Sequence, residues 1–94
     1  MQLYAIRRRS AFADVPDLEL AAARSARVGN AEMPDRVRWI RSYVVEEPDN
    51  RIGTVCIYQA SDIPSIREHA RRAELAADEI VPVLNTVIVR PDPS

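Results

Sequence analysis

The sequence has few of the residues that most often carry chemistry. Its 94 residues include one cysteine, one histidine, two glycines, one tryptophan, one phenylalanine and three tyrosines. A single cysteine cannot form an internal disulfide, so nothing indicates an oxidising compartment. No apolar run approaches the roughly 20 residues needed to cross a bilayer. The apolar residues that precede Arg7 stand in the wrong order for a signal peptide. We therefore expect a cytoplasmic protein without a membrane partner.

The chain also has little net charge. Its formal charge is −1, which argues against binding to nucleic acid or to an anionic membrane. The basic triplet Arg7-Arg8-Arg9 is too short to reverse this balance. If the triplet lies in a strand, its side chains alternate between two faces and cannot form one patch. We interpret it as a solvated edge or a partner contact, not a phosphate site.

Motifs for nucleotide or zinc chemistry are missing as well. There is no P-loop, no dinucleotide fingerprint and no pair of CxxC motifs. The two glycines, Gly29 and Gly53, lie near an expected helix end and an expected hairpin, so neither belongs to a glycine-rich oxyanion loop. These absences make phosphoryl transfer and covalent Cys-His catalysis poor hypotheses.

The periodicity of the remaining residues predicts six elements. Asp14 and Pro16 open an alanine-rich helical pattern that we expect to stop at Gly29-Asn30. A turn at 48–51 joins two alternating runs, in the first of which Val37, Trp39, Arg41, Tyr43 and Val45 should share one face. The predicted strands cover 2–9, 35–46, 52–60 and 80–90, and the predicted helices cover 16–28 and about 62–73.

The predicted order is therefore β-α-β-β-α-β. This is the split βαβ, or ferredoxin-like, arrangement of the α+β class, with a four-stranded antiparallel sheet and both helices on one face. We expect one domain over residues 1–90 and a short tail over 91–94. The uncovered sheet face carries large apolar residues, which predicts a homodimer that packs two sheets face to face as an α+β barrel.

Three segments resemble a known family. They are Trp39-Ile40-Arg41-Ser42-Tyr43-Val44, Cys56-Ile57-Tyr58-Gln59-Ala60 and Ile66-Arg67-Glu68-His69-Ala70. The family is small, single-domain and uncharacterised, and it includes members described as nickel-binding proteins. The resemblance covers Tyr4 to about Val83 and implies a dimeric ferredoxin-like fold with nickel as the candidate cofactor. Members often carry Glu where this chain has Gln59, and Ala-Gly-x-Pro where it has Ala73-Glu74-Leu75-Ala76.

A transition-metal site is the first candidate for chemistry. Imidazole, thiolate and carboxylate ligands suit nickel or zinc. The chain offers His69 and Cys56, with Glu68 as the nearest carboxylate in sequence and Glu74, Asp78 and Glu79 further along. The alternative is a small buried cysteine and a histidine that is hydrogen-bonded at the edge of the core.

A small-molecule pocket between the sheet and the helices is the second candidate. Such a site needs aromatic walls and a few polar contacts. The predicted ligand-binding residues are Trp39, Tyr43, Tyr58, Cys56 and Gln59. In a cofactor-independent enzyme similar to known cyclases or monooxygenases of this fold, His69 would be the base, and Arg41 or Tyr43 would orient the substrate.

Three functional hypotheses remain open from the sequence. The first is a small ligand-binding protein whose ligand is nickel, another transition metal or a small molecule. The second is the acid–base enzyme, and the third is a regulatory or structural module that binds another protein.

Overall fold

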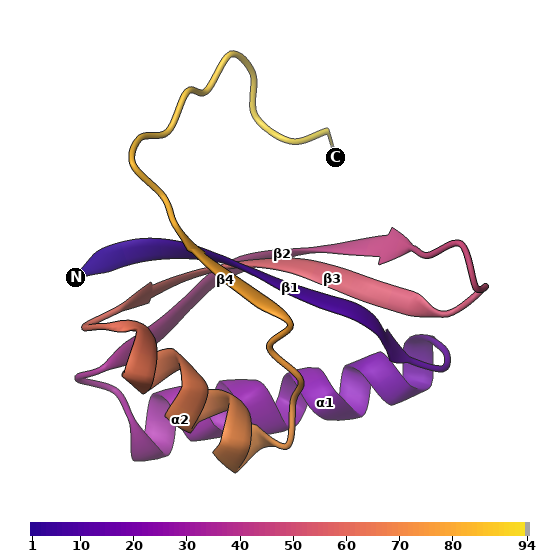
Figure 1. The fold of residues 1–94 in the computed structure, drawn as a ribbon, viewed down its shortest axis with the longest axis horizontal. Coiled ribbons are helices and arrows are strands. Elements are labelled where there is room, and N and C mark those ends of the chain that lie inside the picture. Colours follow the sequence, from indigo (N-terminus) through magenta and orange to yellow (C-terminus); the bar gives the residue numbers. More distant parts are fainter. Residues whose placement is uncertain (94) are drawn as a thin grey trace.

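Four strands form one layer of the molecule and two helices form the other (Figure 1). The structure is a computed structural model that describes residues 1–93. Its elements are β1 (Gln2–Phe12), α1 (Val15–Arg27), β2 (Val37–Glu46), β3 (Ile52–Ala60), α2 (Ile63–Ala73) and β4 (Glu79–Pro82). The strand order is β2-β3-β1-β4, and every neighbouring pair is antiparallel. The predicted ferredoxin-like fold is confirmed.

Both helices begin with the signals that the sequence provides. The side chains of Asp14 and Asp62 each accept a hydrogen bond from the backbone N–H three residues later, at 2.9 Å and 2.8 Å. Each cap is followed by a proline in the first turn, where a missing N–H costs nothing. The Ser65 hydroxyl and then the Ser65 backbone N–H, which both donate to the Asp62 carboxylate, lower the pKa of Asp62.

The end of α1 differs from the prediction. The chain does not stop at Gly29 but continues through a π-helical turn, Val28–Glu32. Gly29 does not adopt the positive φ of a helix-ending glycine. It is buried instead, and a Cβ placed on it would lie 3.8 Å from Nε2 of His69. Gly29 therefore lets the π-helical turn pack closely against α2.

A β-bulge corrects the predicted faces of β2. Trp39 pairs with Tyr58 and Arg41 pairs with Ile57, so Ile40 is an extra residue between them. The alternation consequently resets at Ile40. Trp39 and Ser42 face the helices, whereas Arg41 and Tyr43 face the opposite side, so the prediction that Trp39 shares a face with Arg41 and Tyr43 is wrong.

The last strand is shorter than predicted. β4 ends at Pro82, and one further hydrogen bond joins the N–H of Val83 to the carbonyl of Leu3 at 2.9 Å. Because β4 runs antiparallel to β1, residues 85–93 pass beyond the start of β1 and have no strand to pair with. They form a tail that arches over the helix-free face of the sheet (Figure 1). The tail approaches β2 where the Asp92 carboxylate accepts a hydrogen bond from the Tyr43 hydroxyl at 3.0 Å.

The hydrophobic core lies between the sheet and the helices. None of the helices within residues 1–93 is long and apolar enough to cross a membrane. The core cluster consists of Tyr4, Ile6, Val28, Met33, Val37, Cys56, Tyr58, Ala60, Ile66 and Ala73.

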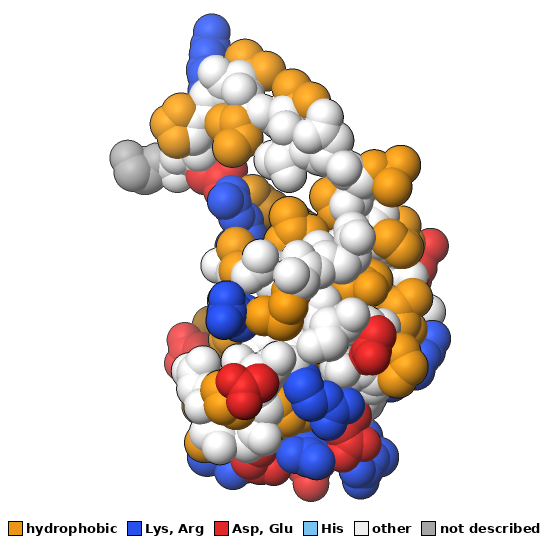
Figure 2. Space-filling model, turned by 90° about the vertical axis from the view of Figure 1, so that its left-hand side faces the viewer, with side chains coloured by type: hydrophobic (Ala, Val, Ile, Leu, Met, Phe, Trp, Pro, Cys, Tyr) orange, Lys and Arg blue, Asp and Glu red, His pale blue; other side chains and the backbone are white. Residues whose placement is uncertain are grey.

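The opposite face of the sheet, which we call the open face, is partly exposed. Tyr43 and Val81 on this face are 42% and 45% exposed, and Leu84 in the tail is 97% exposed. Figure 2 shows hydrophobic side chains around the sheet edge and the tail, while charged side chains gather over the helices. The two layers therefore present surfaces of different character.

Candidate functional site

A cleft opens between α1 and the helix-facing side of β2 and β3. Its volume is about 500 Å³, within the usual range for small-molecule sites. Leu18 and Ala22 of α1 form one wall, and Trp39 and Val44 of β2 form the other. Phe12, at the end of β1, also lines it. The walls are thus mainly apolar.

Small residues on α1 create this space. Ala21, Ala22 and Ser25 face the sheet where larger side chains would fill the gap. β2 is an edge strand, and Val44 near its end is 54% exposed. The alanine-rich composition of α1 therefore leaves one side of the sheet only partly covered.

Trp39 forms an aromatic wall beside the bulge. Its ring stacks on that of Tyr58, with centroids 6.1 Å apart and an interplanar angle of 13°. Its Nε1–H donates a hydrogen bond to Oγ of Ser42 at 2.8 Å, which spans the bulge. These two contacts fix the indole while leaving it 37% exposed.

A chain of polar groups leads from the buried floor of the cleft, at Tyr58 and Ser25, to His69 in the core. The Tyr58 hydroxyl and Oγ of Ser25 are 2.7 Å apart, and Nε2 of His69 is 3.1 Å from the Ser25 carbonyl. Burial raises the pKa of Tyr58 and lowers the pKa of His69. Both groups are therefore neutral near pH 7.

The hydrogen bond to Ser25 defines which ring nitrogen of His69 carries the proton. A carbonyl can only accept, so Nε2 of the neutral ring carries the hydrogen. Nδ1 is then an acceptor, and it is buried without a partner among residues 1–93. His69 itself does not line the cleft; the Tyr58 ring meets it edge to face at 5.3 Å.

Arg8, like Ser25, is a group of the floor that the sequence did not identify as part of a site. Its side chain lines the cleft although the residue is only 1% exposed. Nη1 donates to the Ala76 carbonyl at 2.5 Å, and the guanidinium lies 5.8 Å from the centroid of the Tyr58 ring. Within residues 1–93, Nη2 has no hydrogen-bond partner and the guanidinium has no ion pair. Its position was available from the sequence, because Arg8 alternates in phase with Tyr4 and Ile6.

The predicted ligand-binding residues are divided by the sheet. Trp39, Tyr58 and Cys56 line the cleft. Gln59 and Tyr43 lie on the open face. The proposed orienting residue Arg41 also projects from that side, where Nη1 lies 3.4 Å from the Asp92 carboxylate. It still borders the cleft through its position beside the bulge.

The proposed metal ligands have separate partners. The Cys56 thiol donates to Oγ1 of Thr54 at 3.3 Å. Glu68 is paired with Arg71 and Arg72, which lower the pKa of its carboxyl to about 2. No group of three His, Cys, Asp or Glu side chains within residues 1–93 could hold a metal ion. The free nitrogen of His69 thus has no thiolate or carboxylate set beside it, and these donors do not fit nickel.

Comparison with known proteins places the chain in a family. A family model described as nickel responsive protein SCO4226-like matches residues 4–83. The chain belongs to this family. The span agrees with the resemblance inferred from Tyr4 to about Val83, and the family's name links it to a nickel response.

A solved structure supports the fold of this SCO4226-like protein. The crystal structure of SCO4226 from Streptomyces coelicolor A3(2) matches with a TM-score of 0.72 at 15% identity, and the match covers 90% of this chain and 99% of that one. No curated protein matches the chain. At this identity the structural likeness shows the shared fold only.

Proposed function

We propose that this SCO4226-like protein binds a small organic molecule in the cleft between α1 and β2. The observation that carries the proposal is an apolar cleft of about 500 Å³ with a polar floor of Arg8, Ser25 and Tyr58. Apolar walls provide affinity by burying ligand surface, and a few fixed polar groups orient the ligand.

The geometry supports binding better than the other hypotheses from the sequence. His69 would be the general base of an enzyme, yet it lies outside the cleft lining and its Nε2 contacts Ser25. A metal site would need donors that converge, and none do within the described residues. The nickel response in the family's name describes the family and does not require that this chain itself hold the ion.

A neutral aromatic probe tests the proposal. Naphthalene-2-carboxamide should bind with a dissociation constant in the millimolar range or below and should change the fluorescence of Trp39, the only tryptophan. Ala22→Phe fills the cleft and should abolish binding. Ala23→Phe makes the same change on the exposed side of α1 and should not. Equal binding by both variants would place the probe elsewhere and overturn the proposal.

Calorimetric titration with Ni²⁺ tests the metal alternative. We expect no site in the wild-type protein that is lost in His69→Ala. A tight nickel site that disappears in His69→Ala would show that the histidine is a ligand after all, and it would favour the metal-binding hypothesis over the organic ligand.

We also propose that the open face joins two copies of the chain. The support is its content of partly exposed apolar residues on all four strands: Leu3, Ala5, Val45, Val55, Ile57 and Val81. Light scattering coupled to size exclusion should give about twice 10.6 kDa. A mass near 10.6 kDa at high concentration would contradict the homodimer.

A further inference from the structure

The geometry points to an organic anion as the ligand of the cleft, with its carboxylate bound to Arg8 and its apolar body against Trp39. This inference rests on the proposed function and deepens it, because it names the class of ligand. The structural observations that carry it are one buried guanidinium and the apolar walls around it.

The first step is the state of Arg8. A guanidinium cannot lose its proton in a protein, so burial leaves a full positive charge in the interior. Such a charge is costly unless a counter-charge or a full set of hydrogen bonds compensates it. Arg8 is 1% exposed, and Nη2 has neither among residues 1–93. A ligand anion is the compensation that its position in the cleft allows.

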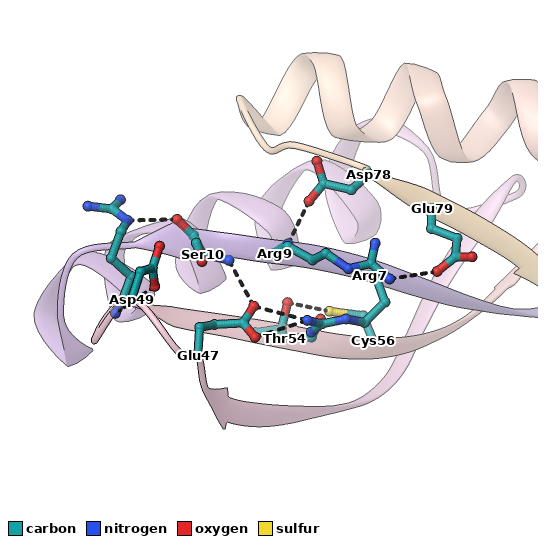
Figure 3. A network of polar contacts seen from close by, with 10 residues as sticks. Arg7, Arg9, Ser10, Glu47, Asp49, Thr54, Cys56, Asp78 and Glu79 are labelled. Atoms are coloured by element: carbon teal, nitrogen blue, oxygen red, sulfur yellow. Dashed lines mark hydrogen bonds and ion pairs between the residues drawn. The ribbon is translucent and has the colours of Figure 1, made fainter.

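The second step is the contrast with the neighbouring arginines. Arg7 forms an ion pair with Glu47 at 3.0 Å, and Arg9 forms one with Glu79 at 3.0 Å (Figure 3). Both lie on the open face, whereas Arg8 points to the helices. The more exposed members of the triplet thus have protein carboxylates, while the buried member has none.

The third step is the charge around Arg8. Among the residues that line the cleft, Glu19 is the only carboxylate, and its side chain is exposed at the rim. The nearest floor groups, Tyr58 and Ser25, are neutral hydroxyls that can accept or donate. No buried carboxylate of the lining therefore competes for the guanidinium, and a planar carboxylate that reached it would make short charge-assisted hydrogen bonds.

The shape of the cleft defines the rest of the ligand. Arg8 lies at the buried end, and the exposed face of Trp39 stands on the side of the opening. A flat or branched apolar group attached to the carboxylate would bury its surface against Trp39, Leu18 and Val44. The ligand class is consequently an aromatic or branched aliphatic carboxylate, not a free inorganic anion.

A matched pair of probes tests the inference. 2-Naphthoate and naphthalene-2-carboxamide share size and shape but differ in charge. Ligand-observed NMR titration of the wild-type protein at pH 7.5 should give a dissociation constant at least about ten-fold lower for 2-naphthoate. Ala22→Phe should abolish the binding of both.

Two arginine variants test whether Arg8 is the group that makes 2-naphthoate bind more tightly than the amide. Arg8→Gln should bring the two dissociation constants within about two-fold of each other. Arg9→Gln removes the same charge one residue later, on the exposed open face, and should leave the preference intact. A preference that survives Arg8→Gln would assign the anion to another group and overturn the inference.

The wild-type comparison separates the two proposals without any Arg8 variant. If both probes bind the cleft equally, the binding function stands and the anion inference falls. If neither probe binds, both fall. If 2-naphthoate binds equally to wild type and Ala22→Phe, it occupies the surface, and the anion inference is again overturned.

Discussion

Two neighbouring residues of β1 show how the faces of this sheet treat charge differently. Arg7 points to the open face, where Nη2 contacts both oxygens of Glu47 at 3.0–3.1 Å. Arg8 points to the helices and is buried under them with one hydrogen bond and a tyrosine ring. The same residue type is thus part of a closed ion-pair network on one side and an uncompensated cation on the other.

The difference teaches that a charge is informative when the fold does not balance it. On the open face, Glu47 also accepts from the backbone N–H of Ser10 at 2.8 Å, so its carboxylate organises the end of β1 (Figure 3). The protein completes this network with its own groups. On the side of Arg8, residues 1–93 supply no such carboxylate, and Nη2 has no hydrogen-bond partner among them.

The largest expected effect comes from shortening one isoleucine on each face of the sheet and comparing the loss in the free energy of unfolding. Ile6 is fully buried on the helix side, and Ile57 is partly buried on the open face. Ile6→Ala should lower the free energy of unfolding by ~2–5 kcal/mol. Ile57→Ala should lower it by less than about 1.5 kcal/mol in a monomer.

Urea denaturation at two protein concentrations measures both isoleucine variants. If Ile57→Ala costs as much as Ile6→Ala and its effect depends on concentration, the open face is buried between two copies and the contrast between the faces disappears.

The second test removes the balance on the open face. Glu47→Gln keeps the shape of the side chain but removes the partner charge of Arg7, so it should lower the free energy of unfolding by ~1–3 kcal/mol. Glu46→Gln, one residue earlier, affects an exposed carboxylate and is the control. Equal, negligible effects in urea denaturation would show that the network adds no stability.

The third test uses the neutral histidine near Arg8. The pKa of His69 is lowered from 6.5 mainly by burial, so the unfolded chain binds a proton more readily than the folded one. The contribution of neutral His69 to the free energy of unfolding should be complete above pH 6.5. It should decrease as the pH drops below 6.5, with a slope of up to about 1.4 kcal/mol per pH unit. The loss should level off below the folded-state pKa of His69.

Chemical denaturation between pH 5 and 7.5 measures this slope. The lowered pKa values of Asp49, Asp62 and Glu68 act at more acidic pH. His69→Gln should therefore flatten the profile in this window. A slope that persists in His69→Gln would assign it to another group.

The smallest expected effect is on Arg8 itself. Arg8→Met keeps an unbranched apolar stem and removes the buried charge, at the cost of the hydrogen bond to Ala76. The free energy of unfolding should stay unchanged or rise by up to about 1 kcal/mol. Arg7→Met, which breaks a pair, should lower it. A large loss in Arg8→Met would mean that the fold needs the cation even without a ligand.

Local signals in the sequence were sufficient for most of the fold. The caps at Asp14 and Asp62 place both helices, and the turn around Asn50 with its two alternating runs places β2 and β3. The last strand was overestimated because β-branched residues near Val87 have strand propensity but no neighbour to pair with. Pairing is a tertiary property, and it ended β4 at Pro82.

The site was harder to predict than the fold. The distinctive residues Trp39 and Tyr58 were identified as a pocket, but Arg8 and Ser25 were missed because they belong to a charge run and an alanine-rich helix. Their importance appears only when burial is known. The bulge at Ile40 has no sequence signature, and uninterrupted alternation through it wrongly assigned Arg41 and Tyr43 to the face of Trp39.

That bulge makes β2 tolerant to a change in chain length. Trp39 lies before the extra residue and Ser42 after it, and both face α1. A chain without Ile40 would alternate regularly and still present Trp39, Ser42 and Val44 to the cleft. The other side chains of β2 therefore face the same sides of the sheet with or without Ile40. A bulge bends the strand that carries it. The segment of β2 around Ile40, which lines the cleft, is therefore curved where a regular strand would be straight.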